Sequence, residues 1–293
     1  MRILVTGGAG QLARSLLQRG EARPGLDVVA VGRPRLDLEQ PDGFETVLDE
    51  VRPDLVINAA AYTAVDAAED DADRAFLVNG EASGQLAAEA ARRELSFIQM
   101  STDYVFSGHG PHGEGDAPAP LGVYGASKLA GEDAVRRAHP RALITRTAWV
   151  YSPWGRNFLS TMMRLGGERS ELSVVADQLG SPTSAPDLAE ALLSIAEIWR
   201  DQPDLGPGET IHLAGSGWTS WHEFAAAIMA ERLRLGLPAA AVKPICTEDF
   251  PTRAVRPKDS RLLTDRAAAL FEVRLPEWRE STIQCVRALA AHG

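Results

Sequence analysis

The segment VYGASKLAGE, residues 123–132, carries a tyrosine and a lysine four residues apart, Tyr124 and Lys128, with only small side chains between them. In a helix this spacing is about one turn, so both side chains would project from the same face. A free tyrosine has a pKa of about 10, too high for efficient proton transfer near neutral pH, and a neighbouring ammonium lowers it. We therefore expect Tyr124 to be an acid whose pKa Lys128 lowers. The pair by itself is also common on surface helices, so the interpretation depends on the residues around it.

A strand with a polar end precedes this pair in the chain. The apolar run at 97–100 predicts a buried strand, and Thr102 follows it. Ligands of open parallel sheets bind beyond the carboxyl ends of the strands, so Thr102 would face a substrate. A carbonyl that takes up a hydride becomes an alkoxide, which needs a proton and hydrogen-bond donors. We expect Thr102 to orient the carbonyl oxygen and Tyr124 to donate the proton, while Lys128 also holds the nicotinamide ribose.

The start of the chain predicts the element that binds such a cofactor. Residues 1–6 form a short apolar run with β-branched members, and the helical pattern of GGAGQLARSLLQRG follows at once. Gly7 and Gly10 stand where a dinucleotide fold needs a tight turn and a close approach of backbone to pyrophosphate. A plain strand-to-helix turn could use the same glycines. Further strands predicted at 26–32 and 54–61, however, have the spacing of alternating strand and helix units.

The ends of these two strands indicate which cofactor binds. After residues 26–32 the acidic residue usual in an NAD site is absent, and Arg33 and Arg35 stand there instead. Either arginine could receive a 2′-phosphate, which favours NADPH and leaves NADH possible, or both could be solvated loop residues. Ala59 and Ala60 could let the backbone lie against the cofactor, or could serve simple close packing.

Composition and charge exclude several classes of protein. The chain has 293 residues, with 40 Asp and Glu against 30 Lys and Arg, so its formal net charge is −10. Nucleic-acid binding relies on a concentrated positive surface, so we expect no nucleic-acid partner. Cys246 and Cys285 are the only cysteines, which suits a reducing compartment. No apolar run reaches the roughly 18 residues of a membrane span. We expect a cytoplasmic protein without a membrane partner.

These patterns predict an α/β fold, a Rossmann-type doubly wound parallel sheet with a smaller, mainly helical substrate-binding lobe. We place the dinucleotide-binding domain at 1–150 and the lobe at 151–293, where the alternation of strands and helices weakens. A segment near 172–198 is expected to return to the first domain, with VVADQLGSP as a further strand. Within the lobe, Ser220 and Glu223 would form a capping box at the start of a helix.

The motifs of the chain resemble those of the dTDP-4-dehydrorhamnose reductase family of extended short-chain dehydrogenases/reductases. They follow the family's order over nearly the whole chain: GGAGQL, NAAAYTAVDAAE, STDYVFSG, VYGASKLAGE, RTAWVYSPWGRNFLSTMMRL, VVADQLGSPTSAPDLAEAL and RPKDSRL. The segments STDYVF, RTAWVY and GRNF together are more specific to this family than the tyrosine–lysine pair, because sugar-nucleotide epimerases and dehydratases also carry that pair. The resemblance implies NAD(P)H-dependent reduction of the C4 keto group of dTDP-4-dehydro-6-deoxy-L-mannose, giving dTDP-L-rhamnose.

The resemblance also implies roles for individual residues. The catalytic residues would be Thr102, Tyr124 and Lys128. Together with the residues inferred above, those expected at the cofactor are Gly7, Gly10, Gln11, Leu12, Arg33, Asp37, Leu38, Ala59, Ala60, Ala61, Tyr124 and Lys128. Those expected at the sugar nucleotide are Thr102, Asp103, Tyr104, Trp149, Arg156 and Asn157, of which the last two would either contact phosphate or hold the lobe in place.

The chain also departs from the family pattern. Family members that form a magnesium-linked dimer use glutamates where this chain has Ser15 and Pro186, so we expect no metal and a monomer or weak dimer. Ser184 and Asp259, both expected on the substrate side, replace residues more usual in the family. They leave open a reductase of another dTDP-4-keto-6-deoxysugar from secondary metabolism. A non-catalytic regulatory subunit with the same fold is a further alternative.

Overall fold

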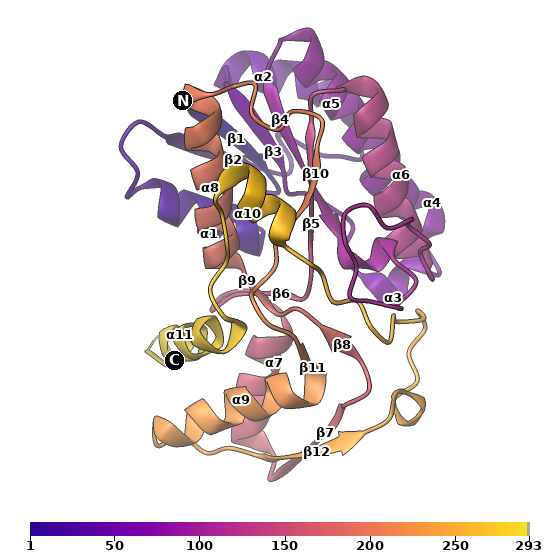
Figure 1. Cartoon of the computed structure of the whole chain (residues 1–293), viewed down its shortest axis with the longest axis vertical. Coiled ribbons are helices and arrows are strands. Elements are labelled where there is room, and N and C mark those ends of the chain that lie inside the picture. The colour runs from indigo at the N-terminus through magenta and orange to yellow at the C-terminus, as the bar shows by residue number, and fades with distance from the viewer. Residues whose placement is uncertain (292–293) are drawn as a thin grey trace.

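A parallel sheet of six strands lies at the centre of the computed structural model, which describes residues 1–291 (Figure 1). Its strands are β1 (Arg2–Thr6), β2 (Asp27–Val31), β3 (Leu55–Asn58), β4 (Ser96–Thr102), β5 (Leu143–Thr147) and β10 (Thr210–His212). Their order is β10-β5-β4-β3-β1-β2, and each neighbouring pair is parallel. The order reverses beside β1, as in doubly wound folds, so the predicted Rossmann-type sheet is confirmed.

Helices cover both faces of this sheet, because its strands are apolar on both sides. The helices of this part of the chain are α1 (Gln11–Gly20), α2 (Phe44–Val51), α3 (Val65–Ala68), α4 (Ala72–Phe76), α5 (Ala82–Arg92), α6 (Val123–Ala138), α8 (Ala185–Asp201) and α10 (Asp265–Phe271), of which the short α3 and α4 pack on α6. On one face, Leu16 of α1 and Leu192 of α8 share a core with Ile3 of β1. On the other face, the core includes Leu48 of α2 and Leu86 of α5.

A smaller lobe occupies the lower part of Figure 1. Its elements are α7 (Phe158–Glu168), α9 (Trp221–Arg234), α11 (Trp278–Ala291), β6 (Val150–Tyr151), β7 (Glu171–Val175), β8 (Leu179–Gly180), β9 (Thr183–Ser184), β11 (Thr219–Ser220) and β12 (Ala241–Ile245). As predicted, Ser220 caps α9 by accepting a hydrogen bond from the Glu223 backbone N–H at 3.1 Å. The Glu223 carboxylate binds the Thr219 hydroxyl instead of the Ser220 backbone, so the box is only half formed. Within residues 1–291, every helix is too short or too polar to cross a bilayer.

The prediction that VVADQLGSP returns to the first domain as a further strand is wrong. Instead, β7 pairs in parallel with β12, and β8 pairs with β11, all within the lobe. Along β7, buried Leu172 and Val174 alternate with exposed residues, which suits a strand with one solvent face. The chain returns to the first core through α8, β10 and α10. Residues 151–293 are therefore not packed as one unit, and the functional division near residue 150 stays a prediction.

Candidate active site

A cavity of about 1140 Å³ crosses the carboxyl ends of the parallel strands. Parallel strands end at the same edge of a sheet, so residues distant in sequence meet there. The predicted site residues that line it are Gly7, Gly10, Gln11, Leu12, Arg33, Asp37, Leu38, Ala59, Ala60, Ala61, Thr102, Asp103, Tyr124, Lys128, Trp149 and Arg156. The predicted residues that do not line it are Tyr104 and Asn157.

The turn between β1 and α1 borders one end of the cavity. Gly7 has a φ of +77°, which side chains other than glycine rarely adopt, and a Cβ there would lie 3.1 Å from the Ala60 Cα. The Gly10 N–H donates to the Gly7 carbonyl at 2.7 Å, which closes the turn. The N-terminus of α1 therefore meets the cavity beside the end of β3, an arrangement that can receive a phosphate group.

Arg33 and Arg35, which the sequence leaves as alternatives, differ in their surroundings. The Arg35 guanidinium forms an ion pair with Glu50 at 2.6 Å, and Arg35 does not line the cavity. Arg33 lines the cavity, and within residues 1–291 its side chain forms neither an ion pair nor a hydrogen bond. Arg33 is thus the arginine of the two that is free to bind an anion there.

Thr102, Tyr124 and Lys128 meet at the end of β4. Thr102 is the last residue of the strand, and its Oγ1 accepts a hydrogen bond from the Tyr104 backbone N–H at 3.2 Å. Tyr124 and Lys128 both lie on α6, one turn apart. Lys128 is only 4% exposed, and its ammonium donates to the Met100 carbonyl at 2.7 Å.

The pKa values in this group differ from the expectation. Burial raises the pKa of Tyr124 to about 12, although a hydrogen bond from the Thr102 hydroxyl opposes the shift. Burial likewise lowers the pKa of Lys128 to about 8, against the attraction of Glu132. The expectation that Lys128 lowers the pKa of Tyr124 is therefore wrong in this structure. The reason is that the ammonium is directed to the Met100 carbonyl, so the loss of hydration on burial is the main influence on the pKa of the Tyr124 phenol.

A buried ion pair that the sequence analysis missed supports the base of α6. Glu132, one turn beyond Lys128, is fully buried and receives two bonds from Arg146 of β5, from Nε at 2.8 Å and from Nη2 at 2.7 Å. The Ser101 hydroxyl of β4 donates to the same carboxylate at 2.5 Å. These contacts fix α6 against two strands. The spacing of Glu132 from Lys128 was the available signal, since it continues the same helix face.

Asn79 is a second residue that the sequence analysis missed. It lies in the π-helical turn η2 (Leu77–Glu81), a feature common at functional sites. Its amide binds both the N–H and the carbonyl of Tyr62, in the segment after β3, at 2.8 and 3.1 Å. The same amide donates to the Ser127 hydroxyl of α6 at 2.9 Å. Asn79 thus ties two walls of the cavity together.

Trp149 lines the cavity in a tightly held conformation. Its φ is +46°, unusual for a residue other than glycine, and its ring stacks on that of Trp221 with centroids 3.5 Å apart. A Cβ on Gly180 would lie 2.3 Å from the Trp149 ring, so only glycine leaves room for it. The tryptophan offers a rigid surface at the boundary between sheet and lobe.

Asn157 and Tyr104 support the site from outside the cavity. Asn157 caps α7, and its amide donates to the Gln11 side chain at 2.8 Å and to the Ser152 carbonyl at 2.9 Å. This geometry matches the expected alternative in which Asn157 holds the lobe in place. The Tyr104 ring packs edge-on against that of Tyr124, with centroids 5.8 Å apart.

Ser184 and Asp259, which differ from the residues usual in the family, do not line the cavity, contrary to the expectation. Ser184 is 3% exposed and caps α8 by accepting a hydrogen bond from the Asp187 N–H. The Asp259 carboxylate receives two hydrogen bonds from the Arg261 guanidinium, at 2.8 and 2.7 Å. Both residues serve local structure in this chain.

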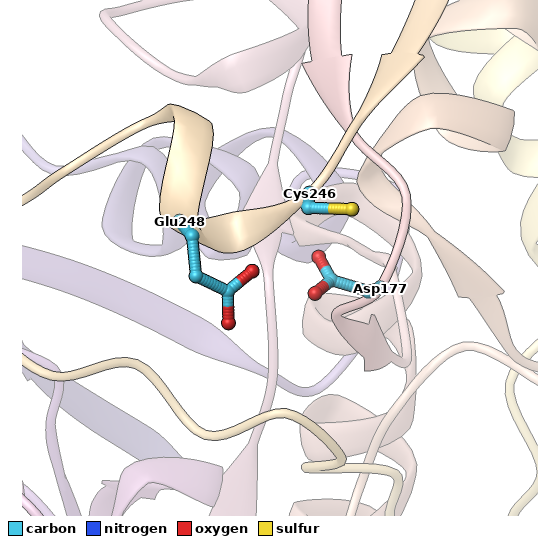
Figure 2. Close-up of side chains that lie close together, drawn as sticks. All are labelled: Asp177, Cys246 and Glu248. Carbon is cyan, nitrogen blue, oxygen red and sulfur yellow. The ribbon is translucent and has the colours of Figure 1, made fainter.

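One group of side chains within residues 1–291 has spacing that could suit a metal. Asp177, Cys246 and Glu248 lie close together at the surface of the lobe, beside the turn η4 (Thr247–Asp249) (Figure 2). One Asp177 oxygen already accepts hydrogen bonds from the Thr247 backbone and hydroxyl, at 2.9 and 2.8 Å. These three residues do not line the cavity, and we assign them no role in the site.

Comparisons with known proteins agree on one family. The sequence model of the protein family described as the RmlD substrate binding domain matches residues 1–291. A dTDP-4-dehydrorhamnose reductase of Sinorhizobium fredii is 41% identical, over 100% of this chain and 99% of its own. A crystal structure of a dTDP-4-dehydrorhamnose reductase from Clostridium acetobutylicum superposes with a TM-score of 0.89 at 36% identity, over 99% of this chain and 100% of its own. A Bacillus anthracis dTDP-4-dehydrorhamnose reductase in complex with NADP has a TM-score of 0.88 at 35% identity, over 97% of both chains.

Proposed function

We propose that this chain, which belongs to the dTDP-4-dehydrorhamnose reductase family, reduces the C4 keto group of dTDP-4-dehydro-6-deoxy-L-mannose with NADPH to give dTDP-L-rhamnose. The observation that most supports the proposal is a single cavity whose wall contains both the Gly7 turn and the trio Thr102, Tyr124 and Lys128. The names of the relatives support a dTDP-sugar substrate, and the Bacillus anthracis complex supports NADP as the nucleotide.

The residues of the cavity suit a dinucleotide. Gly7 and Gly10 would lie against the pyrophosphate, Arg33 would bind a 2′-phosphate and Lys128 would hold the nicotinamide ribose. Bound in this position, the reduced nucleotide would supply the hydride for the sugar carbonyl.

The reacting oxygen would lie between Thr102 and Tyr124. The Thr102 hydroxyl would orient the carbonyl oxygen, and the Tyr124 hydroxyl would donate a proton to the alkoxide that hydride addition leaves. A phenol whose burial raises its pKa to about 12 keeps its proton until such a strong base forms beside it. Trp149 and Arg156 would contact the sugar nucleotide. Cytoplasmic location and a monomer or weak dimer stay predictions.

The test is the loss of NADPH or NADH absorbance with purified protein and the keto-sugar generated in situ, each nucleotide measured separately. We expect oxidation that depends on the keto-sugar. Tyr124→Phe should lower kcat by about 10²-fold or more with folding retained, because it removes a proton transfer made in the transition state. Full activity of that variant would contradict the proposal. If the protein oxidises the nucleotide only with another dTDP-4-keto-6-deoxysugar, the result would favour a reductase of that sugar. If it oxidises neither nucleotide with any of these sugars, the result would favour a regulatory subunit.

A further inference from the structure

We propose that Glu69 is a positioning residue for the reduction: its carboxylate fixes the first turn of α6 and thereby places the Tyr124 hydroxyl, an inference that rests on the proposed function. Glu69 directly follows α3 and does not line the cavity. Its Oε1 accepts a hydrogen bond from the Val123 backbone N–H at 2.8 Å. Val123 is the first residue of α6, and Tyr124 is the second. Glu69 therefore binds this helix at the turn that carries the proton donor, without touching the reacting atoms.

The start of α6 has no side-chain cap of its own. The first N–H groups of a helix lack partners within it, and the side chain of the residue before the helix commonly supplies one. In α6 that residue is Gly122, and the first turn contains no acidic residue. A Cβ on Gly122 would lie 2.7 Å from the Glu69 Oε1, so the glycine leaves room for a carboxylate from another element. Glu69 thus supplies both the hydrogen-bond acceptor and the negative charge that stabilise a helix N-terminus.

The helix α3 is itself held in place, so Glu69 is a fixed support. Asp66 of α3 accepts a hydrogen bond from the Ala254 backbone N–H at 3.1 Å and pairs with the Arg256 guanidinium at 2.7 Å. Both partners belong to the segment between β12 and α10, which binds α3 independently of α6. A side chain restrains its partner well only when its own element is fixed. The position of Glu69 is therefore set by contacts that do not depend on α6.

The remainder of α6 has supports that do not involve Glu69. Lys128, one turn beyond Tyr124, is bound to the Met100 carbonyl, and the buried ion pair with Arg146 holds the following turn. Loss of the Glu69 contact should therefore loosen the turn of Tyr124 while Lys128 keeps its place. Lys128 is expected at the nicotinamide ribose, so the consequence is a lower kcat with an unchanged affinity for NADPH.

The test compares three substitutions of Glu69 in the steady-state reduction of the keto-sugar, with Kd for NADPH measured by fluorescence titration. Glu69→Gln keeps an acceptor oxygen at the same position and should keep most of the wild-type kcat. Glu69→Ala removes the acceptor, and Glu69→Asp shortens the side chain by one carbon–carbon bond, about 1.5 Å, which takes the carboxylate out of hydrogen-bonding reach of Val123. Both should lower kcat about tenfold or more with Kd for NADPH unchanged, because a small displacement of a reacting group slows the reaction steeply.

Amide hydrogen exchange, resolved to single residues by NMR, gives a readout that requires neither substrate nor activity. In Glu69→Ala and Glu69→Asp, the backbone amides of Val123 and Ala126 should exchange faster than in wild type, since the first loses its acceptor and the second bonds to the Gly122 carbonyl within the loosened turn. Amides of residues 131–138 should exchange as in wild type. Glu280→Ala, at an exposed carboxylate in the first turn of α11, is the matched control and should change neither kcat nor exchange in α6.

A wild-type kcat in Glu69→Asp would overturn the inference, and so would unchanged exchange at Val123 and Ala126 in that variant. An equal loss of kcat in Glu69→Gln and Glu69→Ala would also overturn it, because the charge rather than the hydrogen bond would then matter. If Glu69→Ala fails to fold, the other two variants decide. A wild-type protein that oxidises neither nucleotide would count against the proposed function, whereas faster exchange in Glu69→Asp would still show that Glu69 holds the turn of Tyr124.

Discussion

Lys128 should lower the free energy of unfolding at neutral pH, because its ammonium is buried. Its pKa falls from 10.5 to about 8, with burial as the main cause. Each pKa unit corresponds to about 1.4 kcal/mol, so the charged form costs the folded state about 3 kcal/mol below pH 8. Lys128→Met keeps the length of the side chain and removes the charge. We expect this variant to be more stable than wild type at pH 7, by up to about 3 kcal/mol, while it loses cofactor affinity.

The sign of the pH dependence follows from proton binding. Between pH 8 and 10.5 the unfolded state holds the Lys128 proton and the folded state releases it, so the free energy of unfolding of the wild type rises with pH through this window. Lys128→Met lacks this contribution, and the other titrating groups cancel in the comparison. The stability advantage of the variant should therefore shrink by about 2.5 kcal/mol from pH 7 to pH 10.

The assay is urea unfolding of both proteins at pH 7, 8.5 and 10. Lys243→Met serves as the matched control, because Lys243 is exposed on β12, and it should show no such change with pH. The reasoning would be refuted if the difference in free energy of unfolding between wild type and Lys128→Met stayed constant across these pH values. That result would mean that Lys128 keeps an ordinary pKa in the folded state.

Two further predictions concern single arginines. Arg33→Ala should raise KM for NADPH more than KM for NADH, since the 2′-phosphate is the difference between them; equal effects in steady-state kinetics would count against a phosphate contact. Arg146→Met leaves Glu132 buried without its main partner and should lower the free energy of unfolding by about 3–5 kcal/mol. Arg164→Met, at an exposed ion pair with Glu168, should cost less than about 1 kcal/mol. If Arg146→Met and Arg164→Met lowered the free energy of unfolding equally in urea, burial of the Arg146–Glu132 pair would not matter for its contribution.

Local patterns in the sequence were sufficient for much of the fold and for the location of the site. The Gly7 turn between β1 and α1 follows from apolar runs and glycines that are neighbours in the chain. The face shared by Tyr124 and Lys128 follows from helix geometry alone. Thr102 was placed by the rule that parallel strands end at one edge, which requires only the order of the elements.

The tertiary structure decided what depends on groups distant in sequence. Arg33 lines the cavity whereas Arg35 pairs with Glu50, and the Lys128 ammonium is directed to the Met100 carbonyl. The pairing of β7 with β12 was equally hidden, because an apolar run does not identify the strand beside it. The sequence by itself thus determined which chemical groups are present and on which local elements they stand. Only the folded chain decided their partners and their pKa values, because burial and hydrogen bonding arise from contacts between segments that the linear order does not specify.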